Sequence, residues 1–304
     1  MKWLSVGTVV PREHRAVFAT YGLLVVALVV RLAYVDDWTV TRWAVLLAFV
    51  ATVGPDRVPE PTARTLWAGA ALFAGLSWIV TYVPELWFQI AFRLNHAENY
   101  LWNANVAMQE LPFNDGAFLW RHQFEPFTSI VRWIYLNGFD MVVWIPVIRS
   151  LAACDARSVA RYALGAHVLQ FPLIMPFYTM FRVDEVWSVL GHPDRCLRGW
   201  SDETRLNLGA NCFPSMHTSV AFAIWLLSRR EKSKVFRIAM PIYAGSIIFS
   251  TVYMEIHWLV DVAGGLLLGV ASVALADWVV KRGGPRRQSE LEPPGAEDPA
   301  LPAP

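Results

Sequence analysis

Charged residues and cysteines are both scarce in this chain. Asp, Glu, Lys and Arg make up 17% of its 304 residues and hydrophobic residues 55%, which excludes an ordinary soluble domain. Three cysteines, Cys154, Cys196 and Cys212, are too few for a disulfide framework, and their spacing matches no zinc motif. The sequence shows no internal repeat and no N-terminal cleavage pattern, so we expect no cleaved signal peptide. A net charge of +1 gives no reason to expect nucleic acid as a partner.

The hydrophobic residues come in runs close to the roughly 20 residues that a helix needs to cross a bilayer. We therefore expect an all-α integral membrane protein with about eight transmembrane helices. Residues 88–126 carry charges every few positions between aromatic side chains, and are expected to lie in the membrane interface. The expected spans are residues 16–35, 38–53, 66–87, 127–148, 158–181, 214–228, 238–253 and 258–280.

A turn-rich stretch at residues 54–61 separates the first two expected spans from the others. We expect an N-terminal membrane segment with two extra spans over residues 1–63. The other six expected spans form one catalytic transmembrane core over residues 64–280. Residues 281–304 are rich in Pro, Glu and Ala, and are expected to form a disordered cytoplasmic tail.

The distribution of Lys and Arg predicts the orientation of these spans. Basic residues gather in alternate connections, so the positive-inside rule places both termini in the cytoplasm. Residues 88–126, 182–213 and 254–257 are then expected on the extracytoplasmic face, with the plasma membrane as the expected location. Two polar clusters, at 214–217 and 257–261, come to the same face.

These clusters hold the residue types that phosphoryl transfer needs. In the run Pro-Ser-Met-His at 214–217, free amides at a helix start and the Ser215 hydroxyl form an anion site. His217 is placed to donate a proton to a leaving oxygen. His257 and Asp261 are four residues apart, so a helix places them on one face. The carboxylate then fixes the tautomer of the ring and leaves its other nitrogen as a nucleophile.

The run at 214–217 resembles the Pro-Ser-x-His motif of the type 2 phosphatidic acid phosphatase superfamily. Ser250, His257 and Asp261 resemble that superfamily's third motif, which is Ser-Arg, five residues, His, three residues, Asp. The resemblance covers about residues 66–280, although only these two motifs are specific. The local sequence around both motifs is more similar to the inositol phosphorylceramide synthase branch.

The chain departs from the superfamily pattern in three places. Thr251 stands where the third motif has Arg, and Met216 stands where the second motif usually has Gly. The first motif, Lys, six residues, Arg-Pro, is not recognisable. Arg182, at the outer end of the fifth expected span, is the candidate for the missing phosphate-binding cation by its position and charge.

The resemblance implies a role for each residue of the two clusters. His257 would be the nucleophile, Asp261 the residue that orients it, and His217 the general acid. Ser215 would bind the phosphate. The chemistry of the superfamily requires no metal and no other cofactor, so none is expected.

The resemblance implies a membrane enzyme that cleaves a lipid phosphate ester through a phosphohistidine. Loss of the third-motif Arg favours head-group transfer to a lipid hydroxyl, because a phosphodiester intermediate carries one fewer negative charge. The expected partners are a lipid phosphate or phospholipid donor, a lipid alcohol acceptor and the bilayer. A lipid phosphate phosphatase that uses water is the alternative. A lipid transporter or scramblase, or a metal hydrolase with His and Asp ligands, would belong to a different class.

Two predictions concern residues outside the clusters. Cys196 and Cys212 fall in one extracytoplasmic loop, where an oxidising compartment allows a disulfide, so we expect them to pair. His167 lies within the fifth span, and nothing nearby in the sequence completes a site around it. It is expected to serve packing or an interhelical hydrogen bond.

Overall fold

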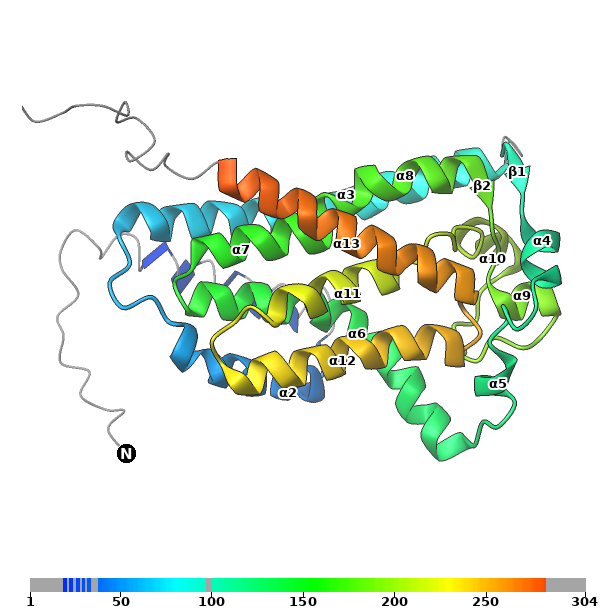
Figure 1. The fold of residues 1–304 in the computed structure, drawn as a ribbon, viewed down its shortest axis with the longest axis horizontal. Coiled ribbons are helices and arrows are strands. Elements are labelled where there is room, and N and C mark those ends of the chain that lie inside the picture. Colours follow the sequence, from blue (N-terminus) through cyan, green and yellow to red (C-terminus); the bar gives the residue numbers. More distant parts are fainter. Residues whose placement is uncertain are drawn as a thin grey trace, which may run out of the picture.

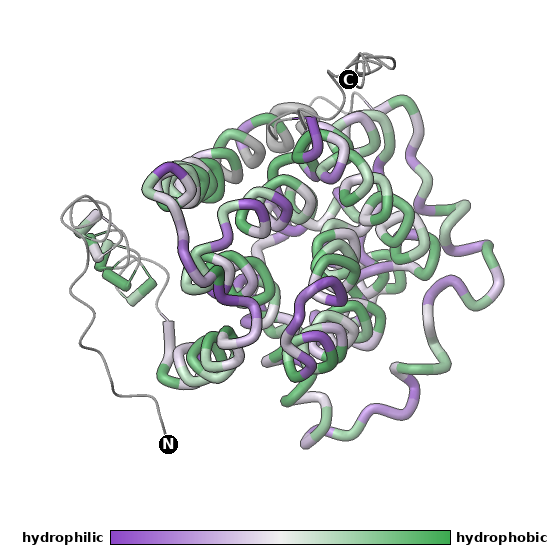
Figure 2. Tube along the Cα trace, turned by 60° about the vertical axis from the view of Figure 1, so that its left-hand side comes forward, coloured by the Kyte–Doolittle hydropathy of each residue, from purple (hydrophilic) through white to green (hydrophobic). Residues whose placement is uncertain are grey.

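The structure, a computed structural model, is a bundle of helices that run along the long axis of the molecule (Figure 1). It describes residues 38–96 and 100–282, together with scattered residues between 19 and 33. The first expected span therefore lies largely outside the described residues, as does the tail beyond Arg282. Figure 2 shows hydrophobic residues running along the helices, with many of the hydrophilic residues in the connections.

Long helices form the bundle, and short elements close one of its ends. The long helices are α2 (Val40–Val50), α3 (Ala63–His96), α6 (Glu125–Ala152), α7 (Ala156–Ala163), α8 (Gln170–Met180), α11 (Met216–Ser228), α12 (Lys234–Tyr253) and α13 (Leu259–Arg282). The short elements are β1 (Trp102–Asn103), α4 (Asn105–Glu110), α5 (Ala117–Trp120), β2 (Phe181–Arg182), α9 (Val186–Leu190) and α10 (Asp202–Leu208). A 3₁₀ helix, η1 (Ala51–Asp56), follows α2.

Among the described residues, four segments are long and apolar enough to cross a membrane: Ala63–Val83 of α3, and the whole of α6, α12 and α13. The helix α11 is equally apolar but has only 13 residues. These helices agree with the expectation of a mostly helical membrane protein. The number of eight spans stays a prediction.

The fifth expected span is irregular in the middle, ahead of its two prolines, and Pro176 lies inside α8. The chain leaves α7 through a π-helix, η2 (Leu164–Val168), and continues as α8. Pro172 lies in the first turn of α8, where the missing N–H has no intrahelical acceptor to lose. The irregularity therefore precedes both prolines, and its position at His167 becomes important below.

Close approach of α13 to α11 brings the two polar clusters together. A Cβ atom at Gly265 would lie 2.6 Å from the carbonyl oxygen of Ser215, and one at Gly269 would lie 2.8 Å from that of Ser219. Only glycine allows the helices to pack at this distance. As a result, the backbone N–H of Ser215 donates to the carbonyl oxygen of Asp261 at 3.0 Å.

The segment 88–126 differs from its expected interfacial form. The helix α3 continues to His96, so the first part of the segment extends a long helix. Further along, β1 pairs in parallel with β2, with Trp102 opposite Phe181 and Asn103 opposite Arg182. Residues 100–124 and the loop 182–213 thus form one cap over the same end of the bundle (Figure 1).

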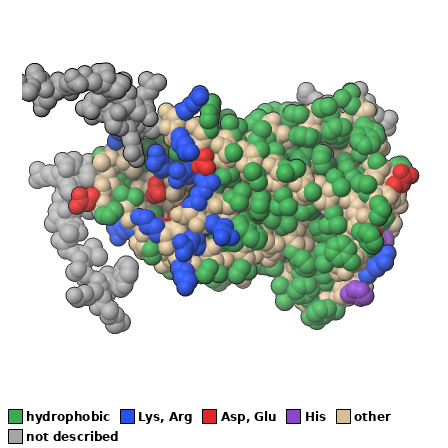
Figure 3. Space-filling view, viewed as in Figure 1, with side chains coloured by type: hydrophobic (Ala, Val, Ile, Leu, Met, Phe, Trp, Pro, Cys, Tyr) green, Lys and Arg blue, Asp and Glu red, His purple; other side chains and the backbone are tan. Residues whose placement is uncertain are grey.

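The opposite end of the bundle is basic and holds a buried ionic network. Lys and Arg side chains gather there, next to a wide hydrophobic surface (Figure 3). The side chain of Arg149 is 1% exposed and pairs with Asp56 and with Glu231. Asp56 also accepts hydrogen bonds from the backbone of Lys232 and Ser233, which ties η1 to the start of α12.

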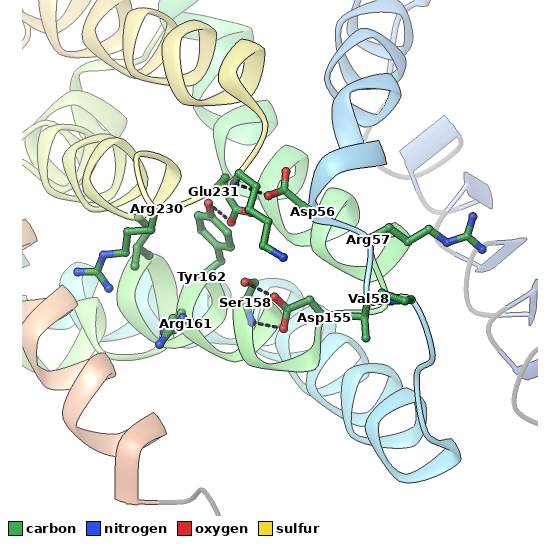
Figure 4. A pocket seen from close by; sticks show the side chains of 12 residues that line it. Asp56, Arg57, Val58, Asp155, Ser158, Arg161, Tyr162, Arg230 and Glu231 are labelled. Carbon is green, nitrogen blue, oxygen red and sulfur yellow. Dashed lines mark hydrogen bonds between the residues drawn. The ribbon is translucent and has the colours of Figure 1, made fainter. Parts of the chain in front are cut away.

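A pocket of about 390 Å³ adjoins this network, far along the bundle from the two polar clusters. Figure 4 shows Tyr162 donating to Glu231, and Ser158 bonded to Asp155, on its walls. The acidic side chains of this pocket are therefore already engaged in hydrogen bonds of the fold.

Candidate active site

The first polar cluster begins α11. Ser215 is the N-cap residue, and its Oγ accepts a hydrogen bond from the N–H of Thr218 at 3.2 Å. Pro214 precedes the cap, instead of lying in the first helical turn as the sequence suggests. Among the described residues, the buried hydroxyl of Thr218 has no partner. The start of α11 thus holds the buried hydroxyls of Ser215 and Thr218 and the N–H groups of a first turn, the donors that an anion site uses, although neither hydroxyl residue lines the cavity described below.

The second cluster lies where the chain turns from α12 into α13. His257 belongs to this turn, and not to the helix on which the sequence places it with Asp261. Its backbone N–H donates to the carbonyl oxygen of Thr251 at 3.1 Å. Asp261, in the first turn of α13, accepts from the N–H of Trp258 at 2.9 Å. That bond fixes the carboxylate beside the His257 ring.

The two side chains face each other as the spacing predicts, although a turn brings them together. His257 Nδ1 lies 3.5 Å from Asp261 Oδ2, an ion-pair distance slightly longer than a hydrogen bond. His257 is 4% exposed and Asp261 is fully buried. Within the described chain, neither ring nitrogen of His257 nor Oδ1 of Asp261 has a hydrogen-bond partner. Buried polar atoms without partners are rare in folded proteins, and a bound polar group explains them.

His217 lies across from His257, with 5.8 Å between the ring centroids. The rings of Tyr135 and Phe139, both on α6, lie at 5.1 Å and 4.4 Å from the His217 ring. These aromatic contacts fix the plane of the imidazole, which is partly exposed. The importance of α6 here was not visible in the sequence, because neither aromatic residue belongs to a motif.

Both histidines line a cavity of about 510 Å³. Tyr178, Glu185, Arg198 and Cys212 also contribute to its walls. Its volume falls within the range of small-molecule sites. The cavity is therefore large enough for a phosphorylated head group between the two imidazoles.

Arg182 does not line this cavity. Its guanidinium pairs with Asp184, at 3.1 Å between Nε and Oδ1, next to the β1–β2 pairing. The cation on the cavity wall is Arg198, which binds Glu185 at 2.9 Å and Asp194 at 2.9 Å. Burial alone would lower the pKa of Arg198, but its bonds to Glu185 raise that pKa above its usual value. Arg198 is therefore a permanent cation.

Asn114 supports the second cluster from a distant part of the chain. Its backbone oxygen accepts from the N–H of Leu259, and its Oδ1 accepts from the N–H of Val260, both at 2.9 Å. Asn114 is 3% exposed. It therefore caps α13 directly before Asp261. No sequence signal identifies it, since its partners are 145 and 146 positions away.

Glu255 holds the loop 182–213 against the same turn. Its side chain is fully buried, pairs with His192 and binds Arg195 at 2.9 Å. Its backbone oxygen accepts from the N–H of Trp187 at 2.9 Å. A single acidic residue inside an apolar run, two positions before His257, is the signal that would have indicated a structural role.

The expected disulfide is absent. Cys196 and Cys212 are both free in the structure, and they pack in two different hydrophobic clusters. Cys196 contacts residues of the α6 and α12 region, whereas Cys212 lies among residues around Trp258. Burial raises the pKa of Cys196 to about 12 and raises that of Cys212 well above its usual value. The prediction failed because the two residues of one loop pack into different hydrophobic clusters.

Cys212 also stands near the proposed nucleophile. Donor atoms of Cys212, His257 and Asp261 all lie within 4.8 Å of one another. Sulfur, imidazole nitrogen and carboxylate oxygen are the ligand types that Zn²⁺ takes. These residues could hold such an ion after small movements, and the sequence did not indicate Cys212 as a member of this group.

Comparison with known proteins identifies part of this region. Residues 186–284 match the model of the PAP2 superfamily. The matched segment runs from α9 to the end of α13, so it includes His217, His257 and Asp261 but neither Asn114 nor Arg182. No curated protein and no solved structure matches the chain. The similarity supports an enzyme of the phosphatase type, and it does not distinguish between branches of the superfamily.

Proposed function

We propose that this protein is a membrane enzyme that cleaves a lipid phosphate ester through a phosphohistidine on His257. The observation that carries the proposal is the setting of that ring. Nδ1 faces the Asp261 carboxylate, while Nε2 is buried without a partner among the described residues and belongs to a cavity wall shared with His217. The PAP2 similarity over the same residues supports this reaction class.

In the first step, His257 Nε2 attacks phosphorus, and the bond from phosphorus to the leaving oxygen breaks. His217 gives its proton to that oxygen, so that an alcohol departs instead of an alkoxide. Asp261 stabilises the positive charge that develops on the His257 ring. Ser215 and the first N–H groups of α11 bind the oxygens of the phosphoryl group.

In the second step, a hydroxyl oxygen attacks phosphorus while His217 removes its proton, and the bond from phosphorus to His257 Nε2 breaks, which releases the free imidazole. We propose a lipid alcohol as the acceptor, which makes the reaction a head-group transfer of the inositol phosphorylceramide synthase type. The rings of Tyr135 and Phe139 pack against His217 at the cavity wall and support this choice, because apolar walls hold water less well and transfer requires that water be kept from the intermediate. With water as the acceptor, the same residues would act as a lipid phosphate phosphatase.

We propose further that the site faces the extracytoplasmic side of the plasma membrane, with both termini in the cytoplasm. The basic end of the bundle lies opposite the site (Figure 3), in agreement with the positive-inside rule. The proposed architecture keeps about eight spans, six of them in the catalytic core over residues 64–280.

Two arginines are candidates for the phosphate-binding cation. Arg182 remains the prediction from the sequence, and Arg198 is the one on the cavity wall. The variants Arg182→Met and Arg198→Lys separate them when KM is measured for one phosphodiester lipid. A rise in KM confined to Arg182→Met assigns the role to Arg182, and a rise confined to Arg198→Lys assigns it to Arg198.

The decisive experiment offers the purified protein a phosphodiester lipid together with a lipid alcohol. We expect a new phospholipid to form faster than free head-group phosphate is released. His257→Ala should abolish turnover, while its elution in gel filtration stays that of the wild type. More than a few per cent of residual activity in this variant would overturn the mechanism.

Two further measurements define the reaction class. Turnover that survives EDTA excludes a role for a metal at Cys212, His257 and Asp261. Ready release of inorganic phosphate from phosphatidic acid, with no transfer product from any lipid alcohol, assigns the protein as a phosphatase. Absence of turnover with every lipid phosphate favours a transporter or scramblase.

A further inference from the structure

A second cavity opens from the wall of the catalytic cavity. Its volume is about 110 Å³, on the order of four water-sized groups at roughly 30 Å³ each. The two cavities share four lining residues, Phe139, Asp140, Phe171 and Met216. Apolar residues such as Val80, Val143 and Val220 form most of the remaining wall.

This cavity lies deeper in the bundle than the two catalytic histidines. Val220 lines it and follows His217 by three residues on α11, which corresponds to about 4.5 Å along the helix axis. A phosphate held at His257 would therefore have this space beneath it. At that distance a lipid has its linkage region, where the head group meets the alkyl chains.

His167 lines the second cavity together with two other polar residues, Gln170 and Asp140. The carboxylate of Asp140 lies 3.9 Å from the guanidinium of Arg42. His167 itself is 6% exposed, and its Nε2 is buried with no hydrogen-bond partner in the described part of the chain. Packing and an interhelical hydrogen bond are its two expected roles, and among the described residues this atom makes no hydrogen bond. Polar side chains at membrane depth are costly and are usually retained for a function.

The polar side chains packed near His167 have hydrogen-bond partners, whereas its own Nε2 has none within the described chain. Gln170 donates to the carbonyl oxygen of Gly165 at 3.0 Å and accepts from Ser219 at 2.6 Å. Ser272 donates to the same oxygen of Gly165 at 2.6 Å. The neighbouring polar side chains are thus satisfied, while the π-helix points His167 toward the cavity that it lines. Such π-helical turns occur frequently at functional sites.

We propose that the second cavity binds the beginning of an acyl or alkyl chain of the donor lipid, and that His167 Nε2 hydrogen-bonds an oxygen of its linkage region. The proposal rests on the proposed function, since it places the phosphate of the same lipid at His257. The ligand class is a lipid with a carbonyl or hydroxyl oxygen close to its phosphate. His167 is thereby a positioning residue, and takes no part in bond breaking.

The first test separates the hydrogen bond from the shape of the ring. In His167→Phe we expect KM for a long-chain ester-linked donor to rise on the order of fivefold, the loss of one hydrogen bond, with kcat retained. His167→Gln keeps a donor and an acceptor, and should restore most of the affinity. An ether-linked donor without a hydroxyl offers no comparable oxygen, so its KM should be the same in all three proteins.

The second test blocks the cavity. Val80 is a partly buried wall residue on α3, so Val80→Trp should fill the space and raise KM for long-chain donors severalfold. Thr81→Trp adds the same ring one position along at an exposed site outside the cavity wall, and should behave as the wild type.

Cross-linking reports the site without turnover. A phospholipid with a diazirine near the carbonyl end of its chain should label residues 164–171 of His257→Ala, and Val80→Trp should reduce this labelling severalfold. Labelling spread evenly over lipid-facing helices, or KM values in His167→Phe and Val80→Trp equal to those of the wild type, would overturn the inference. If a lipid alcohol reduces the labelling of residues 164–171 and a donor phospholipid does not, the cavity belongs to the acceptor, and its assignment to the donor is refuted. A wild type without any turnover contradicts the proposed function, while this labelling still decides on the cavity.

Discussion

The two ring nitrogens of His257 have different surroundings, and this asymmetry leads to a prediction about Asp261. Asp261→Asn keeps the size of the side chain and an oxygen for the N–H of Trp258. It removes the negative charge 3.5 Å from His257 Nδ1. We expect kcat to fall about 100-fold or more, because the charge that develops on the ring loses its partner. Steady-state kinetics with a phosphodiester lipid measures the effect.

Asp277→Asn is the matched control, because Asp277 lies on the same helix and pairs with Arg230 at the opposite end. Its turnover should equal that of the wild type. Equal kcat values for the two variants would show that Asp261 does not assist the reaction.

A second prediction at this scale concerns the cysteines. Because burial raises the pKa of Cys196 to about 12 and that of Cys212 well above its usual value, little thiolate forms at pH 8. Iodoacetamide should therefore react in the native protein with Cys154, which is partly exposed, much faster than with either buried thiol. Mass spectrometry after denaturation without reductant should show all three cysteines alkylated. Two thiols that resist alkylation under those conditions would prove the disulfide that the structure lacks.

The sequence identified the residues with a local signature and missed those without one. His217, His257 and Asp261 are brought together as expected, because short motifs at the ends of helices keep their geometry. Asn114 could not be found, since its role depends on a hydrogen bond to Val260, which is 146 positions away in the sequence. For Arg182, the sequence left pairing with Asp184 or Glu185 open beside the catalytic role, and the structure shows the pair with Asp184.

At the scale of elements, the start of α13 depends on a cap supplied by a neighbouring segment. Asn114→Ala removes the acceptor for the N–H of Val260 and the donor to the carbonyl oxygen of Met108. We expect a loss of about 1 kcal/mol in the free energy of unfolding, the usual value of a helix cap. A reduced kcat should accompany it, because Asp261 lies in the turn that loses its cap. Thermal unfolding in detergent and steady-state kinetics measure the two effects.

Asn114→Asp serves as the comparison, because a carboxylate still accepts the helical N–H and favours the positive end of the helix dipole. It should retain most of the activity. If Asn114→Ala and the wild type unfold and turn over alike, the cap has no importance for the site.

The elements themselves were predictable to different extents. Hydrophobic runs located α6, α12 and α13 to within a few residues, because long apolar helices carry a strong periodic signal. The π-helix at Leu164–Val168 gave no such signal, because a π-turn carries no residue pattern of its own. The pairing of β1 with β2 joins residues that are 79 positions apart in the sequence. Each strand has only two residues, which is too short for β-propensity to indicate it.

At the scale of the molecule, the bundle has an ionic end and a catalytic end. Arg149→Met would leave Asp56 and Glu231 buried without their cation, at an expected cost of about 3–5 kcal/mol. We expect a lower midpoint of thermal unfolding in detergent. The effect on KM should be small in the folded fraction, since Arg149 lies far along the bundle from the cavity.

Arg157→Met provides the control, because Arg157 is exposed on α7, near the same end. Its unfolding midpoint should match the wild type. A midpoint for Arg149→Met within error of that control would mean that the buried pairs contribute nothing to stability.

The cap that Asn114 provides has a consequence for the order in which the enzyme is made. Residues 105–116 leave the ribosome long before α13 is synthesised, and their partner N–H groups at Leu259 and Val260 exist only when the chain is nearly finished. Until then the segment has no helix to cap, because α13 and its residue Asp261 have not yet been synthesised. The reactive centre is therefore assembled last, after the greater part of the chain has entered the membrane. A nascent or prematurely terminated chain thus holds His217 without His257 and Asp261.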